Sequence, residues 1–232
     1  MKITFCVTCY DGDVHLLHGR LMSIYEEQTV KPDEVLVITS GISSGPIVWD
    51  SNKPNLTIKT FEYRMLPGGA RNQGGRFAKG DVVCFCDVDD PIHPQKCEVI
   101  KRVFGNSDVD ALLHNYNMDT HEFSKIDDIE NIEIEKVTKF DSRWEEVQKS
   151  TPPIDGGYYC IDGDLPRTTV TIDSGRPATH GHLSVRKEVL SEIKYIENMR
   201  IGEDGEFCQS IIKNDKFSLY YTPLVLINYI TQ

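Results

Sequence analysis

Three carboxylates stand together near the middle of the chain. Asp87, Asp89 and Asp90 directly follow Asp81–Cys86 (DVVCFC), an apolar stretch with the pattern of a buried strand. Residues i and i+2 of an extended chain share a face, so Asp87 and Asp89 are expected to converge on one point. Two convergent carboxylates suit Mg²⁺ or Mn²⁺, which would neutralise a diphosphate leaving group. A solvated acidic turn at the end of a strand is the alternative interpretation.

The elements before and after this cluster alternate between strand and helix patterns. Helical spacing or breaker residues predict helices at Val14–Gln28, Ala70–Lys79 (with Gly80 as its stop) and Pro94–Phe104. Apolar, β-branched runs predict strands at Ile3–Cys9, Glu34–Thr39, Leu56–Phe61, Asp81–Cys86 and Ala111–Tyr116. Such alternation predicts an α/β fold with a mostly parallel central sheet flanked by helices. Ligands of such sheets bind beyond the carboxyl ends of the strands, where Asp87 lies.

The second half is less regular. It predicts a helix at Asp204–Lys213 and strands at His182–Val185, Phe217–Tyr221 and Val225–Tyr229. Ser40–Asn55 has the breakers of a loop, and residues 151–181, with four Pro and five Gly, are expected to form a flexible region. No linker is evident, so we expect one domain over residues 1–232, with a nucleotide-binding half (1–117) and an acceptor-binding half (118–232).

Composition limits the partners. The 232 residues carry a formal charge of −11, which disfavours nucleic acid and means that a phosphate-bearing ligand needs a local cation. The start lacks a signal-peptide pattern, and the apolar run Leu224–Ile227 is too short for a transmembrane anchor, so we expect a cytoplasmic protein. Cys6 and Cys9 form a C-x-x-C without a matching second pair, which favours buried reduced thiols over a zinc site.

Several motifs in order resemble the core of nucleotide-sugar glycosyltransferases of the GT-A fold, and most of all the inverting family two. The similarity covers most of residues 3–117 and 181–229. The matching segments are Val7–Asp11, Gln28–Val37, Gly68–Gly74 (GGARNQG), Ala78–Asp81 (AKGD), the strand ending in Asp87–Asp90, Gly181–Lys187 and Gly202–Phe207. The resemblance implies a Rossmann-like, nucleotide-diphospho-sugar transferase fold and a Mn²⁺ or Mg²⁺ cofactor.

The resemblance also implies a reaction. A sugar would move from a UDP- or GDP-type donor to a hydroxyl of a glycan, glycoprotein or other acceptor. Asp204 would be the base that takes the acceptor proton, with Glu203 as its neighbour. The structural alternative is that acids at a helix N-terminus are favoured by the exposed N–H groups and the helix dipole.

Donor contacts are implied at several positions. Thr8, Tyr10 and Asp11 would contact the base and ribose, and Asp87 with Val88 the nucleotide-sugar. Arg71 would bind the diphosphate, since a guanidinium matches phosphate oxygens, or else form a salt bridge. Asn72 is expected to bond the backbone at the start of its own helix. Ser40 stands where the family often has a base-reading acid, so the identity of the base stays open.

His182 is a candidate third metal ligand, although a lone histidine is more often structural. His180 flanks the same glycine, Gly181. Aromatic side chains suit sugars, so Trp144, Tyr158 and Tyr159 are candidates for contact with the acceptor.

Two other functions compete with this interpretation. A sugar nucleotidyltransferase would need a Gly-rich basic loop after the first strand, but Tyr10–Asp13 is acidic with one glycine. A carbohydrate-binding protein of the same fold without catalysis is the second alternative, and the presence of both the Asp87/Asp89 pair and Asp204 argues against it.

Overall fold

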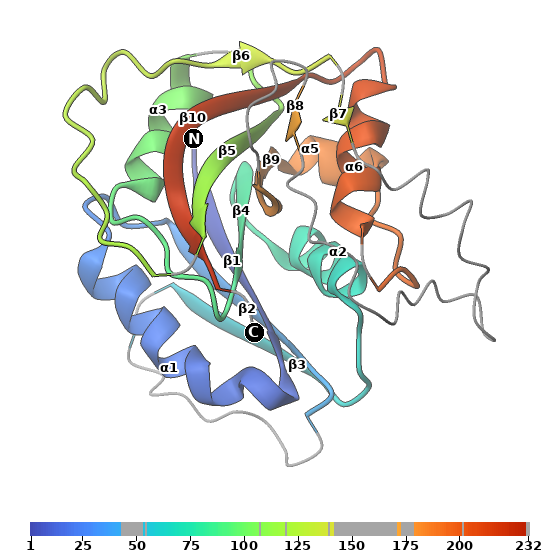
Figure 1. The fold of residues 1–232 in the computed structure, drawn as a ribbon. Coiled ribbons are helices and arrows are strands. Elements are labelled where there is room, and N and C mark those ends of the chain that lie inside the picture. Colours follow the sequence, from blue (N-terminus) through green and yellow to red (C-terminus); the bar gives the residue numbers. More distant parts are fainter. Residues whose placement is uncertain are drawn as a thin grey trace.

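The computed structural model describes residues 1–42, 53, 55–106, 108–118, 120–138, 140–141, 171–172, 179–200 and 202–230. Its centre is an eight-stranded sheet in the order β3-β2-β1-β4-β9-β5-β10-β6 (Figure 1). The strands are β1 (Ile3–Tyr10), β2 (Glu34–Ser40), β3 (Leu56–Phe61), β4 (Val82–Asp87), β5 (Ala111–Met118), β6 (Glu135–Lys136), β9 (Thr179–Arg186) and β10 (Leu219–Tyr229). A second small sheet pairs β7 (Phe140–Asp141) with β8 (Thr171–Ile172).

Strand directions place the chemistry at one edge. β3, β2, β1 and β4 run parallel to one another, while β9 lies antiparallel between β4 and β5. β10 is parallel to β5. The carboxyl ends of β1, β4, β5 and β10 therefore meet at the same edge, which brings Thr8 of β1 beside Asp87 of β4 in register.

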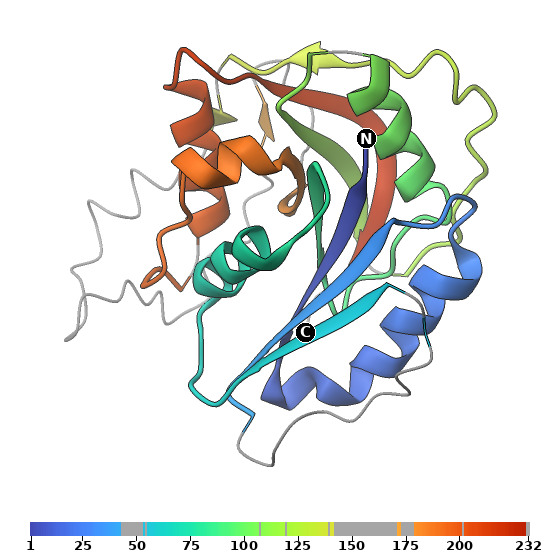
Figure 2. The same cartoon turned by 180° about the vertical axis from the view of Figure 1, so that it is seen from behind.

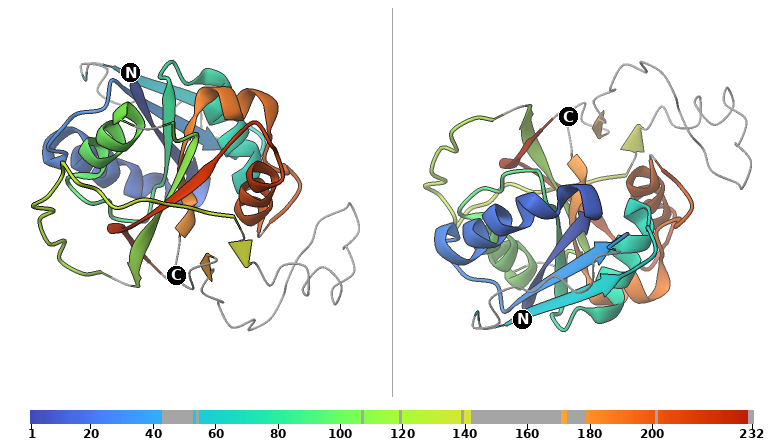
Figure 3. Two further views of the ribbon diagram at one scale, coloured as in Figure 1. Left: turned by 90° about the horizontal axis from the view of Figure 1, so that it is seen from above. Right: turned by 90° about the horizontal axis from the view of Figure 1, so that it is seen from below.

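Helices cover both faces of this sheet (Figures 1 and 2). One face carries α1 (Val14–Met22), its π-helical continuation η2 (Ser23–Glu27) and α3 (Lys96–Asn106); the other carries α2 (Pro67–Phe77), α5 (Lys187–Glu192) and α6 (Glu203–Ile212). The views along the sheet in Figure 3 show the resulting three layers. A short 3₁₀ turn, η1 (Asp11–Asp13), joins β1 to α1.

Each face has its own hydrophobic core. Strand alternation sends Cys6 to the core under α2, α5 and α6, and Cys9 to the core under α1 and α3, as expected of two thiols at i and i+3. All six cysteines among the described residues are buried and free, which confirms the expectation of reduced thiols for them. Among the described residues, no helix combines the length and the apolar character needed to cross a bilayer.

Two sequence expectations about element ends were wrong. α2 starts at Pro67 rather than Ala70 and ends at Phe77, so Gly80 is not its stop. Gly80 instead lets the chain pass β1 closely, because a Cβ there would lie 2.7 Å from the Thr4 nitrogen. The two strands expected at 217–221 and 225–229 are one strand, β10, whose register shifts after Thr222 accommodate Pro223.

Some expectations concern residues outside the described part of the chain. Trp144, Tyr158 and Tyr159 lie there, as does nearly all of the region 151–181 and most of the loop expected at Ser40–Asn55. The side chain of His180 is also outside it.

Candidate active site

Asp87, the last residue of β4, is held by side chains from two neighbouring elements. Thr8 donates its hydroxyl to Asp87 Oδ1 at 2.9 Å, and Arg71 Nη2 of α2 lies 3.3 Å from both carboxylate oxygens. Burial acts to raise the pKa of Asp87, but Arg71, His182 and Thr8 outweigh it and lower that pKa below its ordinary value. The Asp87 side chain stays 29% exposed, so it is a charged carboxylate that a ligand can reach.

The turn after β4 brings Asp90, rather than Asp89, next to Asp87. Asp90 Oδ2 lies 2.8 Å from His182 Nε2, and that nitrogen lies 3.7 Å from Asp87 Oδ2. Asp90 Oδ1 accepts the Ile230 amide at 2.8 Å. The chain leaves the strand at Asp87 and bends, so the i, i+2 alternation behind the expectation for Asp89 no longer applies. Burial and the charges of Asp90 and Asp87 raise the pKa of half-buried Asp89.

Asp87, Asp90 and His182 could hold a divalent cation. Each offers one ligand atom, and these three atoms all lie within 4.8 Å of one another. Two carboxylate oxygens and one imidazole nitrogen form a donor set that a divalent cation can accept. Of the three side chains expected as ligands, Asp87 and His182 belong to this group, which Asp90 and not Asp89 completes.

Glu203 and Asp204 begin α6 at the same edge. Glu203 Oε1 accepts Arg71 Nη1 at 2.5 Å, and both side chains are buried. Burial and the Asp204 carboxylate raise the pKa of Glu203, while Arg71 acts in the opposite direction. Asp204 Oδ1 accepts the Gly205 amide at 2.8 Å, as an acid at a helix N-terminus can.

Arg71 therefore bridges two acids that lie far apart in the sequence. Its guanidinium is buried and occupied by Asp87 and Glu203, whereas the sequence analysis had it bind the diphosphate or join a surface salt bridge. In this structure its charge stabilises the close approach of those carboxylates.

Gly181 of β9 lies where these groups meet. A Cβ at this position would lie 3.1 Å from Arg71 Nη2, 3.3 Å from Asp87 Oδ2 and 3.7 Å from Asp204 Oδ2. A side chain would fill the space that Asp87 and Asp204 share. Their convergence depends on β9 passing between them, which no local sequence pattern could reveal.

An exposed aromatic ring lies at the carboxyl ends of β1 and β2. Tyr10 is 37% exposed, with the Arg64 guanidinium 4.2 Å from its ring centroid. Gly41 follows β2 with a φ of +76°, and its Cβ position is 3.1 Å from the Tyr10 ring. Asp11 is exposed beside it, whereas Ser40 is buried. Tyr10 and Asp11 are thus accessible to a nucleotide.

Arg20, which the sequence did not single out, is a buried cation behind the acidic turn. Its Nε donates to the carbonyl of Val88 at 3.3 Å. Burial lowers the pKa of Arg20, and the acidic turn, Asp90 included, acts to raise it. Val88 is itself buried, so its side chain is not available to a ligand. The available signal was a lone charge between Leu17 and Leu21 on the core-facing side of α1.

Asn72 does not bond its own helix start, so that expectation was wrong. Its amide donates to the Tyr195 carbonyl and its oxygen accepts the Tyr195 amide, each at 3.0 Å. The Tyr195 ring stacks on Phe207 of α6 with centroids 4.0 Å apart. Asn72 therefore fixes α2 to the segment that leads into Glu203 and Asp204.

Comparison with known proteins identifies the family. Residues 4–157 match Glycosyl transferase family 2, which is more than half of the chain, and the chain belongs to that family. It is 29% identical over 122 residues to an uncharacterized glycosyltransferase of Nostoc sp., covering 51% of this chain and 37% of that protein. An uncharacterized glycosyltransferase of Haemophilus influenzae is 28% identical over 95 residues, covering 40% of this chain and 32% of that protein.

Solved structures share the fold. TarS 1-349 of S. aureus in complex with UDP-GlcNAc matches with a TM-score of 0.63 at 17% identity, covering 100% of this chain and 59% of that chain. The mannosyltransferase PcManGT of Pyrobaculum calidifontis, in complex with GDP-Man and Mn²⁺, matches at 0.58 and 17% identity, covering 99% and 56%. At such identities the likeness shows the fold, which confirms the GT-A expectation.

Proposed function

We propose that this chain transfers a glycosyl group from a nucleotide-diphosphate sugar to an acceptor hydroxyl, assisted by a divalent cation and with inversion at the anomeric carbon. Family membership supports the reaction class. The main structural support for the arrangement of donor and base is that the carboxylates of Asp87 and Asp204 both approach the same space beside Gly181. A donor-holding acid and a base for the acceptor must stand this close to act on one sugar.

The donor half of the site follows from the ends of β1 and β4. Exposed Tyr10 and Asp11 would receive the base and ribose, and Asp87, Asp90 and His182 would hold the cation. When bound, Mn²⁺ or Mg²⁺ would offset the charge that develops on the leaving diphosphate. Neighbouring structures with UDP-GlcNAc and with GDP-Man support a nucleotide-sugar donor of either type.

The acceptor half depends on Asp204. Its carboxylate would accept the proton of the attacking hydroxyl. Glu203 is engaged by Arg71, so it would hold the start of α6 in place rather than take that proton. Arg71 would keep Asp87 and Glu203 at fixed positions, and would act on the diphosphate only through them.

Donor hydrolysis tests the metal. UDP-GlcNAc and GDP-mannose would be assayed with Mn²⁺ and with EDTA, for the wild type and for Asp87→Asn, Asp90→Asn and Asp89→Asn. We expect EDTA and Asp87→Asn to lower turnover about 100-fold or more, as loss of electrostatic stabilisation does. Asp90→Asn should raise the Mn²⁺ concentration required more than Asp89→Asn does.

Exposed Asp215 offers a matched control, and Asp215→Asn should leave turnover unchanged. Turnover that is indifferent to both EDTA and Asp87→Asn would rule out the metal-assisted reaction.

A second assay separates the base from the donor site. Asp204→Asn should abolish transfer, while a thermal shift with nucleotide diphosphate and Mn²⁺ persists, because ligand binding to the native state needs no base. The product's anomeric configuration, read by NMR, should be opposite to that of the donor. Retention of configuration, or full transfer by Asp204→Asn, would contradict the proposed role.

A further inference from the structure

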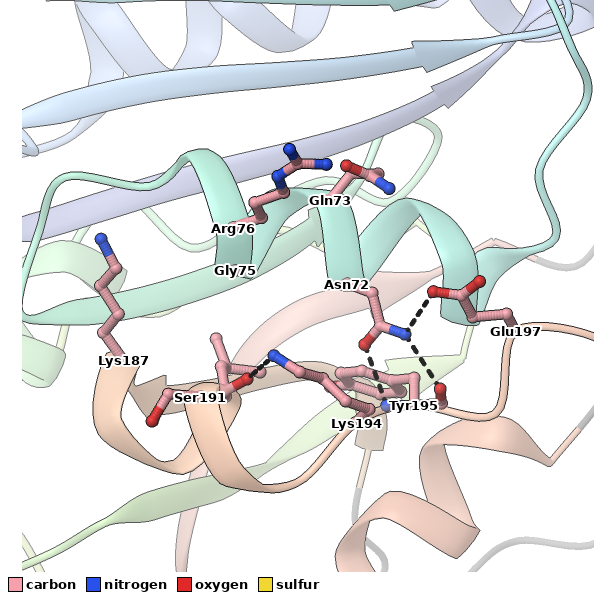
Figure 4. Close-up of a pocket in the computed structure, with 10 residues that line it drawn as sticks. Asn72, Gln73, Gly75, Arg76, Lys187, Ser191, Lys194, Tyr195 and Glu197 are labelled. Atoms are coloured by element: carbon pink, nitrogen blue, oxygen red, sulfur yellow. Dashed lines mark hydrogen bonds between the residues drawn. The ribbon is translucent and has the colours of Figure 1, made fainter.

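A groove on the outer side of α2 has no role in the proposed reaction. It has a volume of about 500 Å³ and lies between α2 and α5 (Figure 4). Three cationic side chains line it: Arg76 from α2, Lys187 from the start of α5, and Lys194 from just after α5. The chain as a whole carries a formal charge of −11, so this concentration of positive charge is local.

None of these three cations forms an ion pair with a carboxylate among the described residues. Lys187 donates to the Ala78 carbonyl and Lys194 to the Leu190 carbonyl, so neutral partners fix their positions without cancelling their charge. The Arg76 guanidinium lies 5.3 Å from the centroid of the Phe77 ring. Charges that are held in place but not neutralised favour an anionic ligand.

The groove also contains one carboxylate, that of Glu197, and the three cationic side chains outnumber it. Glu197 Oε1 accepts the Asn72 amide at 3.0 Å, as Figure 4 shows at the end of the groove opposite Lys187.

The cations come from separate positions along the groove. At about 1.5 Å per helical residue and more beyond the helix, the Cα atoms of Lys187 and Lys194 are separated by on the order of 10 Å. A ligand that contacts both lysines can therefore be longer than a single phosphate group. Arg76 lines the groove from the α2 side.

We propose that the groove binds an extended chain that carries phosphate groups, as the distal part of an anionic acceptor. The acceptor role rests on the proposed function, but the binding does not. Asn72 and Tyr195, which line the groove, also connect α2 to the segment before Glu203 and Asp204. A chain bound here would lie against the elements that position the base.

Inorganic polyphosphate is a probe for this site that needs no turnover. Binding of a fluorescently labelled medium-length polyphosphate would be measured by anisotropy in EDTA at low salt, so that the cation site cannot contribute. The wild type should bind, and the combined variant Arg76→Glu/Lys187→Glu/Lys194→Glu should bind at least about tenfold more weakly, with the difference shrinking as salt screens the charges. Asp87→Asn should bind as the wild type does.

Two further variants serve as controls for misfolding and for nonspecific charge effects. Arg76→Glu alone changes an exposed side chain and should weaken binding several-fold with an unchanged unfolding temperature, which rules out misfolding as the cause. Lys213→Glu reverses an exposed charge outside the groove and should stay within about twofold of the wild type, as a surface substitution does.

The inference is overturned if the wild type does not bind polyphosphate, or if the combined variant binds equally well. It is also overturned if anionic lipid vesicles bind through these residues while polyphosphate does not. Metal-dependent donor hydrolysis is measured separately. If no donor hydrolysis is found, the proposed function is wrong, but polyphosphate binding in the groove is unaffected. If hydrolysis is found without polyphosphate binding, only the proposal for the groove is wrong.

Discussion

The two faces of α2 hold arginines in opposite surroundings. Arg71 faces inward, is buried, and contacts Asp87 and Glu203. Arg76 faces outward, is exposed, and has no carboxylate partner among the described residues. The inward arginine is the counter-charge that allows acids from β4 and α6 to lie together, while the outward one is available to a ligand. One helix thus supports the reaction centre on one side and offers a binding surface on the other.

The largest effect is expected at Arg71. Arg71→Met would leave Asp87 and Glu203 without their shared counter-charge, so the free energy of unfolding should fall by about 3–5 kcal/mol, as when one partner of a buried pair is removed. Donor turnover should fall about 100-fold or more, because the displaced carboxylates no longer hold their geometry. Urea denaturation and donor hydrolysis measure the two effects.

Arg71→Lys is the matched control. It keeps the charge but cannot reach two carboxylates with a planar fork, so it should recover only part of the stability. If Arg71→Met were as stable as the wild type, the buried arginine would contribute no more to stability than an exposed one, and the two faces of α2 would not differ in this respect.

The stability difference between wild type and Arg71→Met should depend on pH. The pKa of Asp87 is lowered in the folded protein because Arg71 and His182 outweigh burial. A lowered folded pKa contributes stability above the unfolded pKa of about 3.9, and this contribution is lost as pH falls through the folded pKa. The Arg71→Met variant lacks the part of this stabilisation that comes from the Arg71 charge.

The gap in unfolding free energy should therefore be widest near neutral pH and narrow below about pH 4. Denaturation curves of both proteins across that range provide the measurement. A gap that stays constant across that range would mean that Arg71 stabilises the fold by packing and not by charge.

Much of the inward face could be predicted from sequence. Parallel strands end at one edge, which predicted a ligand site at Asp87 after β4. The expected roles of Asp204 and His182 came from the resemblance to glycosyltransferases. The contacts that Asp90 and Arg71 make could not be predicted. Asp90 depends on how a turn bends after β4, and the Arg71–Glu203 pair joins residues that only the folded sheet brings together.

The outward face carries no recognisable pattern. Arg76, Lys187 and Lys194 are separated in sequence and are ordinary surface residues when read one at a time. Their charges gather only because α5 packs beside α2. Sequence motifs mark residues that share local geometry, and this groove has none.

A glycine on the inward face should show a smaller effect than Arg71. A Cβ at Gly74 would lie 2.5 Å from Cys6 Sγ and 3.1 Å from the Phe85 ring. Gly74→Ala should therefore lower the free energy of unfolding by about 1–3 kcal/mol, the cost of overpacking a core. Gly19 of α1 has nothing within 4 Å of its Cβ position, so Gly19→Ala should raise that free energy by about 0.5–1 kcal/mol through helix propensity. Equal effects at both glycines would mean that α2 does not press against β1.

The smallest effect is expected on the outward face. Arg76→Met removes an exposed charge whose described contact is a cation–π approach to Phe77, so the free energy of unfolding should change by only about 0.5 kcal/mol. Urea denaturation beside Arg71→Met compares two identical substitutions five positions apart on one helix. If Arg76→Met proved as damaging as Arg71→Met, then Arg76 would be part of the framework of α2, and its charge would not be available to a ligand. A small loss, with weaker polyphosphate binding, would assign the two arginines to separate tasks.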